Sequence, residues 1–164
     1  MTTFTCSSPE LRQAGPKSWC LPGLLAMALL AVTSACAPLI ARFDAQSYSQ
    51  AVSLKVDALA LMDDATEPYA QHEAEARALA VKLDKAFEYA QGKPRNELSA
   101  RQWQILKDPQ RHLLGGFLAR WKAESTLGHA YILEKKGQVG MAFDQIIGLE
   151  SGKLKPADIA GTGG

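Results

Sequence analysis

The sequence predicts an all-α fold: an antiparallel four-helix bundle with a broken third helix, following an N-terminal signal peptide. Three observations support this expectation. Apolar residues recur at intervals of three and four in successive stretches after residue 43. Short segments rich in Pro, Gly, Asp and Ser separate these stretches, and short loops favour antiparallel neighbours. No stretch shows the alternating apolar and polar residues of a half-buried strand.

The chain begins with a segment organised like a secretory signal peptide. Arg12 and Lys17 form a positive n-region, and an uncharged, largely apolar run follows them. Small residues then lead to Cys36. We expect residues 1–35 to be a lipoprotein signal peptide. Residues 36–43 are then a lipid anchor and tether, with fatty acyl chains such as palmitate on Cys36.

The end of this leader resembles a bacterial lipobox, in which small residues precede an obligatory cysteine; Thr33 stands where that pattern usually has leucine. The resemblance implies a protein held by its lipid on the periplasmic side of a membrane. Ala37, rather than an acidic retention residue, follows the cysteine, so the outer membrane is the expected destination. Two alternatives remain at this point. Ala35–Ala37 also fits an A-x-A cleavage site, and Leu21–Ala41 could remain as an uncleaved anchor.

Residues 44–150 are expected to form the helical domain. Asp44 can cap a first helix that runs to about Asp64, and a second helix is expected from Pro68 to Gln91. Gly92 follows it as a candidate C-cap.

The third helix is expected to be broken. Ser99 to Gln102 reads as a capping box for a short helix to Lys107, and Asp108-Pro109 then reads as a new N-cap followed by a first-turn proline. Ser125 or Thr126 can cap the last helix, from about Leu127 to Glu150, whose apolar stripe includes Ile132, Leu133 and Phe143. Residues 151–164 are polar and Gly-rich, and we expect a disordered tail.

Leu113 to Trp121 (LLGGFLARW) is the most unusual stretch of the domain. Two adjacent glycines inside a helix cost about 1 kcal/mol each relative to alanine. Close approach of a neighbouring backbone is the favoured explanation. The alternatives are a hinge, a groove floor that a partner occupies, or a helix that ends there.

The chain is similar to a group of small, uncharacterised proteobacterial lipoproteins. The resemblance lies in Ser99 to Trp121 (SARQWQILKDPQRHLLGGFLARW) and in Gln138 to Lys153 (QVGMAFDQIIGLESGK). It implies export and a helical domain, and it carries over no catalytic residue.

Catalytic and cofactor motifs are not recognisable. His72-Glu73 begins like the zinc motif H-E-x-x-H, but Ala76 occupies the second histidine position. His112 and His129 fall on other expected helices. No G-x-S-x-G elbow or phosphate loop is present. We therefore expect a protein that is not an enzyme and that has no cofactor and no metal site.

Charge gives the last expectation. The full chain has a net charge of +1, which offers no basic excess for nucleic acid. Residues 43–91 carry nine acidic and four basic side chains, whereas residues 92–125 carry seven basic and three acidic ones. These halves can complement each other internally. Alternatively, part of the basic half forms a partner-binding patch, whose candidate residues are Trp103, Arg111, Arg120, Trp121 and Lys122.

These observations favour a non-enzymatic, lipid-anchored cell-envelope protein with a binding or structural role, whose partner is the membrane together with an envelope protein or a cell-wall polymer. One alternative is a protective factor against a toxin or phage. The other is an exported enzyme with an unrecognised site.

Overall fold

The structure is a computed structural model that describes residues 43–155 and 158–159. The expected signal peptide (1–35), the lipidation site Cys36 and the tether up to residue 42 lie outside these residues. The described chain is helical and contains no strand. Its elements are, in chain order, α2 (Ala45–Asp63), the 3-10 turn η2 (Asp64–Thr66), α3 (Tyr69–Gly92), α4 (Glu97–Lys107), α5 (Leu114–Glu124) and α6 (His129–Glu150).

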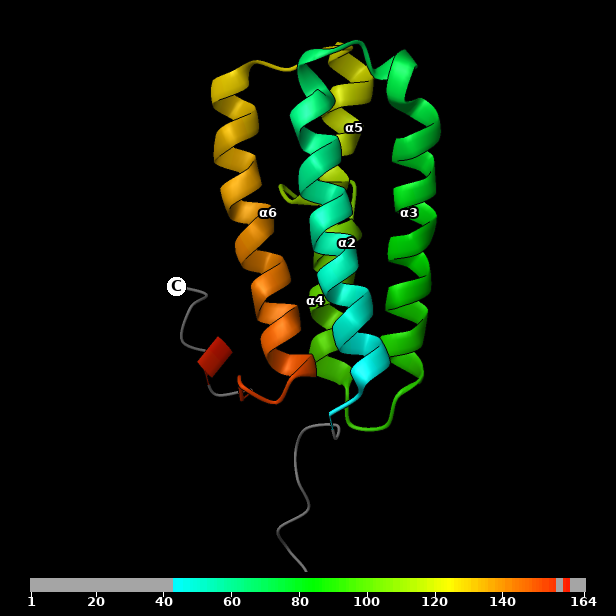
Figure 1. The fold of residues 1–164 in the computed structure, drawn as a ribbon, viewed down its shortest axis with the longest axis vertical. Coiled ribbons are helices and arrows are strands. Elements are labelled where there is room, and N and C mark those ends of the chain that lie inside the picture. Colours follow the sequence, from blue (N-terminus) through cyan, green and yellow to red (C-terminus); the bar gives the residue numbers. More distant parts are fainter. Residues whose placement is uncertain (1–42, 156–157, 160–164) are drawn as a thin grey trace, which may run out of the picture. The chain divides into compact units, whose positions relative to one another are not determined.

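The helices pack side by side (Figure 1). Helix α2 contacts both α3 and α6, and α4 contacts the same two helices. Helix α5 continues in the direction of α4 and contacts α3 and α4 (Figure 1). The apolar faces of all these helices meet in one core, whose largest fully buried side chains are Trp121, Phe117, Phe143, Met62 and Leu83. The all-α prediction is confirmed for the described residues.

One core assignment is wrong. Leu133 was expected on the inward stripe of the last helix, yet 64% of it is exposed. The buried positions of α6 include Ile132, Val139 and Phe143. Because each residue advances about 100° around a helix, Leu133 lies beside the buried line and not on it.

The first helix begins as expected, whereas the capping box does not form. The Asp44 carboxylate accepts a hydrogen bond from the Gln46 backbone N–H at 2.9 Å. Helix α4 instead begins at Glu97, two residues earlier than Ser99. The Ser99 side chain is buried inside the helix and donates to Glu150 on α6. A long-range acceptor therefore replaces the local one that the motif implied.

The break in the third helix is longer than expected. Asp108 ends α4 with extended backbone angles, as a residue before proline must. Its carboxylate accepts from the Gln110 backbone N–H at 2.8 Å, a local turn that competes with helix. Helix α5 therefore starts at Leu114, and the expected restart at Pro109 is wrong.

The paired glycines allow a close backbone approach. A Cβ on Gly115 would overlap the carbonyl group of Lys107, and a Cβ on Gly116 would overlap the carbonyl oxygen of Arg111. The favoured explanation is thus confirmed, with the end of α4 and the residues after it as the neighbour. Only glycine lets α5 start directly over the segment that precedes it.

The two ends of α6 also differ from expectation. Ser125 has a φ of 68° and ends α5, while Gly128 precedes α6. After Glu150 the chain turns back at Gly152, whose φ is 71°. The Leu154 backbone N–H then donates to Gly148 O at 3.0 Å, and its side chain covers that glycine. Ser151 and Leu154 therefore contact α6, while Gly152, Lys153 and Lys155 are exposed, so the expected tail begins with an ordered turn.

Candidate functional site

The two tryptophans of the expected patch belong to the core. Trp103 is 2% exposed and packs edge-on against Phe143, with ring centroids 5.9 Å apart. Trp121 is fully buried, and its indole N–H donates to the carbonyl oxygen of Glu67 at 3.0 Å. The expectation that either ring lies partly exposed beside the basic residues is therefore wrong. Their apolar area is needed to hold the helices together.

The basic residues of the expected patch do not share one surface. Arg120 pairs with Glu124 at 2.8 Å and lies over the Tyr131 ring of α6. Lys122 pairs with Glu73 of α3 at 3.0 Å, on the other side of α5. Arg111 lies in the break between α4 and α5, 3.7 Å from Asp108. Lys122 lines the groove between α3 and α5, to which Arg111 and Arg120 do not contribute.

That groove lies between α3 and α5 and has a volume of about 470 Å³. Its apolar lining comes from both helices: Ala76, Ala80 and Leu83 on α3, and Gly115, Leu118 and Ala119 on α5. Small residues predominate on both sides, so few side chains fill the space. The break after Asp108 contributes as well, because Pro109 lines the same groove. The glycine pair therefore allows a close approach and also forms part of a groove wall.

Two ion pairs connect the walls of the groove. Glu73 and Lys122 join α3 to α5 at 3.0 Å, next to Tyr69. Asp84 and Lys107 join α3 to the end of α4 at 2.8 Å. These contacts link the acidic second helix to the basic third one, which agrees with the internal explanation of the charge division.

Arg77 lies between the two ion pairs on the groove wall. It is exposed, and no acidic residue within the described part of the chain pairs with it. The hydrogen bond that Lys122 donates to Glu73 raises the pKa of the lysine ammonium, whereas the charge of Arg77 lowers it. The two cations are thus close enough to repel each other. The groove wall therefore carries one uncompensated positive charge.

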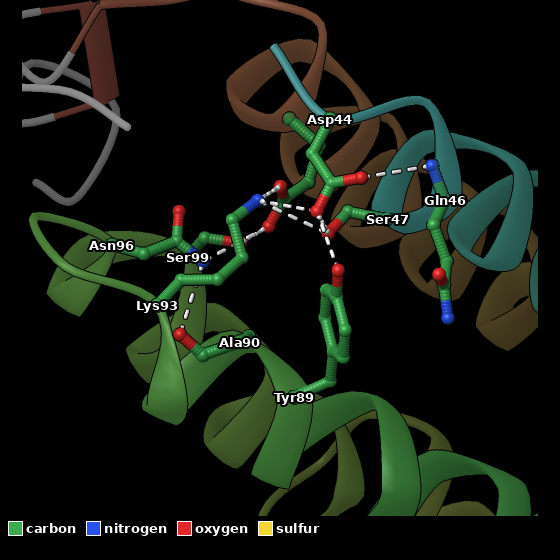
Figure 2. A network of polar contacts seen from close by, with 9 residues as sticks. Asp44, Gln46, Ser47, Tyr89, Ala90, Lys93, Asn96 and Ser99 are labelled. Atoms are coloured by element: carbon green, nitrogen blue, oxygen red, sulfur yellow. Dashed lines mark hydrogen bonds and ion pairs between the residues drawn. The ribbon is translucent and has the colours of Figure 1, made fainter. Parts of the chain in front are cut away.

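A second cluster joins the ends of four helices (Figure 2). Glu150, at the end of α6, is 4% exposed. Its carboxylate accepts from Ser99 Oγ at 2.5 Å, Asn96 Nδ2 at 3.2 Å and Lys93 Nζ at 2.8 Å. Lys93 also lies 3.5 Å from the Asp44 carboxylate, which caps α2.

The outer part of this cluster has a perturbed acid. The hydroxyl of Tyr89 donates to Asp44 at 2.8 Å and, with the backbone N–H groups and Lys93, lowers the pKa of that carboxyl to about 2. The same contact raises the pKa of Tyr89. Asp44 is therefore ionised across the physiological range.

The Glu150 cluster invites a catalytic interpretation, because Lys93 Nζ lies 3.1 Å from Ser47 Oγ. A serine nucleophile of the Ser-Lys type requires a neutral lysine as its base. Here Lys93 Nζ instead donates to Glu150 at 2.8 Å and lies 3.5 Å from the Asp44 carboxylate, so it is held by contacts that have no role in activating a serine. Every buried side-chain polar atom of the described chain has a partner. The cluster therefore fits a structural clasp between helix ends.

No signal in the sequence identified Glu150 as a buried acid, because a glutamate at a helix end is usually solvated. The groove was partly predictable from the spacing of small residues in the sequence. Ala76 and Ala80, like Gly115 and Ala119, repeat at the four-residue spacing that places small residues on one helix face.

The histidines do not take part in either the groove or the Glu150 cluster. His72 contacts Glu67 at 3.0 Å, and no group of three potential metal ligands comes together in residues 43–155 and 158–159. None of the helices within that same part has the length and apolar character needed to span a bilayer. Comparison of the chain with protein-family models, with curated proteins and with solved structures finds no match.

Proposed function

We propose that this chain is a non-enzymatic, lipid-anchored protein of the cell envelope, whose helical domain binds another molecule on the periplasmic side of the membrane. Acyl chains on Cys36 hold it there, and the outer membrane is the proposed destination. The uncharged segment before Cys36 and the small residues that lead into that cysteine support the anchor.

The proposal includes the arrangement of the helices. We take α2, α3, the consecutive pair α4 and α5, and α6 as the four members of an antiparallel bundle whose third helix is broken. The contacts of α2 and α4 with both α3 and α6 support this assignment. The groove lies between α3 and α5, and Pro109 in the break of the third helix lines it.

The observation that carries the binding role is this groove. Two of its lining residues, Ala80 and Ala119, are exposed, while buried Leu83 and Gly115 lie beside them. Concave sites with an apolar lining and a few charged groups are the usual places where proteins bind ligands. The remaining polar cluster around Glu150 is internally satisfied.

Labelling with palmitate tests the anchor. Three acyl chains on Cys36 would exceed the two signals that stable membrane attachment requires. Labelled palmitate should therefore enter the wild-type chain and not Cys36→Ala. Equal labelling of both proteins, or of neither, refutes the lipoprotein assignment.

Site-specific photo-crosslinking tests the binding role. A photoreactive residue at Ala119 in intact envelopes should give a discrete, saturable adduct. The same residue at Ala74 is the matched control, since Ala74 is exposed on α3 and does not line the groove. If neither position gives an adduct, or if both give the same pattern, the groove has no binding role.

A further inference from the structure

We propose that the groove between α3 and α5 binds an anionic amphiphile: one apolar chain with a carboxylate or phosphate head. The inference rests on the binding role proposed above and gives it a ligand class. The size, the lining and the charge of the groove each fit such a ligand.

The size of the groove fits a single-chain ligand. Its volume of about 470 Å³ lies within the usual range of small-molecule sites. The two ion pairs bound it along α3 at Glu73 and Asp84. At 1.5 Å per residue, these positions are about 16 Å apart along the helix axis. A ligand that lies between the two ion pairs is therefore limited to about this length.

The lining fits an apolar chain that lies along the groove. Between the ion pairs, α3 contributes Ala76, Ala80 and Leu83, and α5 contributes Leu118 and Ala119. These side chains carry no hydrogen-bonding atoms. An apolar chain can therefore remove them from water without leaving a polar group unsatisfied.

The charges select an anionic head. Arg77 is the uncompensated cation on the wall, and Lys122 lies within its electrostatic range. Lys122 is 63% exposed and its partner Glu73 is 57% exposed. Exposed ion pairs contribute little, so the ammonium can move toward a ligand at small cost. A guanidinium is suited to bind carboxylate or phosphate through two hydrogen bonds.

A partner helix fits this groove less well than an amphiphile does. A helix is about 10–12 Å wide with its side chains. To lie along the groove it would have to cross both the Glu73–Lys122 and the Asp84–Lys107 pairs. A slender apolar chain can lie between the two pairs, and only its head group needs to draw Lys122 away from Glu73.

The test is photo-labelling of the full chain in its membrane with dodecanoate that carries a diazirine on the chain. We expect adducts on fragments that contain Ala80 or Leu118, and competition by unlabelled dodecanoate. A dodecyl-trimethylammonium probe with the same diazirine should label these fragments much less. Dodecyl phosphate and a lysophospholipid are further competitors, and their relative potency distinguishes a free acid or phosphate from a lipid headgroup.

Variants then assign the adducts to the groove. Ala80→Trp places a large side chain on an exposed position of the lining and should reduce labelling at least about tenfold, while Ala74→Trp should not. Arg77→Gln should raise the half-competing concentration of dodecanoate about fivefold, the effect of losing one partly exposed charge contact. Lys85→Gln, which removes a cation from α3 outside the groove, is its matched control.

Three outcomes overturn the inference: no adduct at either fragment, equal labelling by the cationic probe, or unchanged labelling of Ala80→Trp. Labelling that an added amphipathic peptide abolishes while dodecanoate does not would assign the groove to a protein partner instead. Cys36→Ala retains the whole groove and should be labelled like the wild type. Failure of the anchor and failure of the groove are therefore separate results.

Discussion

Glu150 offers the sharpest test of how the helix ends are held together. Replacement by alanine removes the acceptor of three donors: Lys93 and Asn96 in the connection between α3 and α4, and Ser99 on α4 (Figure 2). The Glu150 side chain is 2% exposed and that of Lys93 is 15% exposed. Solvent can therefore replace the lost carboxylate only in part.

The expected loss follows from what each donor retains. Asn96 keeps its bond to the carbonyl oxygen of Ala90 at 3.1 Å, and Lys93 keeps Ser47 and the more distant Asp44. The Ser99 hydroxyl has no other acceptor within residues 43–155 and 158–159. Removal of one member of a buried ion pair costs about 3–5 kcal/mol. With Asp44 still near the ammonium, we expect the lower end, about 3 kcal/mol.

Urea unfolding of the purified full chain, followed by far-UV circular dichroism, measures this loss. In a thermal melt of the same protein, the midpoint should fall by about 12–24 °C, because a loss of 1 kcal/mol lowers the midpoint of a domain of this size by about 4–8 °C. Glu150→Gln keeps an oxygen that can accept from Ser99, so this variant should lose about half as much free energy of unfolding as Glu150→Ala.

Asp57→Ala is the matched control. Asp57 pairs with Lys82 at 2.8 Å, but both side chains are about half exposed. Its removal should change the free energy of unfolding by no more than about 1 kcal/mol. If Glu150→Ala loses no more than Asp57→Ala, the cluster does not hold the helix ends together.

Three further predictions concern the core, the glycine pair and pH. Leu83→Asp should unfold the domain because it buries an unpaired charge, whereas Leu133→Asp should keep the wild-type midpoint because that side chain is exposed; circular dichroism melts decide. Gly115→Ala should destabilise by about 1–3 kcal/mol or more in urea unfolding, since the added methyl meets backbone; a neutral result would show that α5 can shift. The pKa of Asp44 is lowered from 3.8 to about 2, so its contribution to stability is present above pH 3.8 and is lost as the pH falls toward 2. Tyr89→Phe removes the largest cause of that shift and should flatten the decline of the unfolding midpoint between pH 4 and 2, whereas an unchanged decline would exclude the Tyr89 contact as its source.

The described helices were largely predictable because their signals are local. Asp44 caps α2 through the backbone of its own first turn, and the apolar positions of α3 recur on one face with the period of the helix. The glycine pair was also informative, since a close backbone approach was the favoured explanation of two adjacent glycines and the structure contains it.

The candidate sites were less predictable because they depend on which helices become neighbours. The residues from Ser99 to Gln102 match a capping box, but the Ser99 hydroxyl donates to the buried carboxylate of Glu150 on α6 and does not cap its own helix. Tryptophan is common at binding surfaces, but the side chains of Trp103 and Trp121 are buried in the core. Arg120 and Lys122 are two residues apart and therefore point to different neighbours.

The sequence by itself determined the helical fold of the described domain and the starts of α2 and α3, and it favoured a close approach at Gly115. Each of these follows from the periodicity and the backbone preferences of a short segment. Only the tertiary structure decided that Glu150 is a buried acid with three donors, that Arg77 lies unpaired on a groove wall and that Leu133 faces solvent. These properties depend on the surroundings that distant segments create, because burial and charge compensation are set by neighbours in space and not by neighbours along the chain.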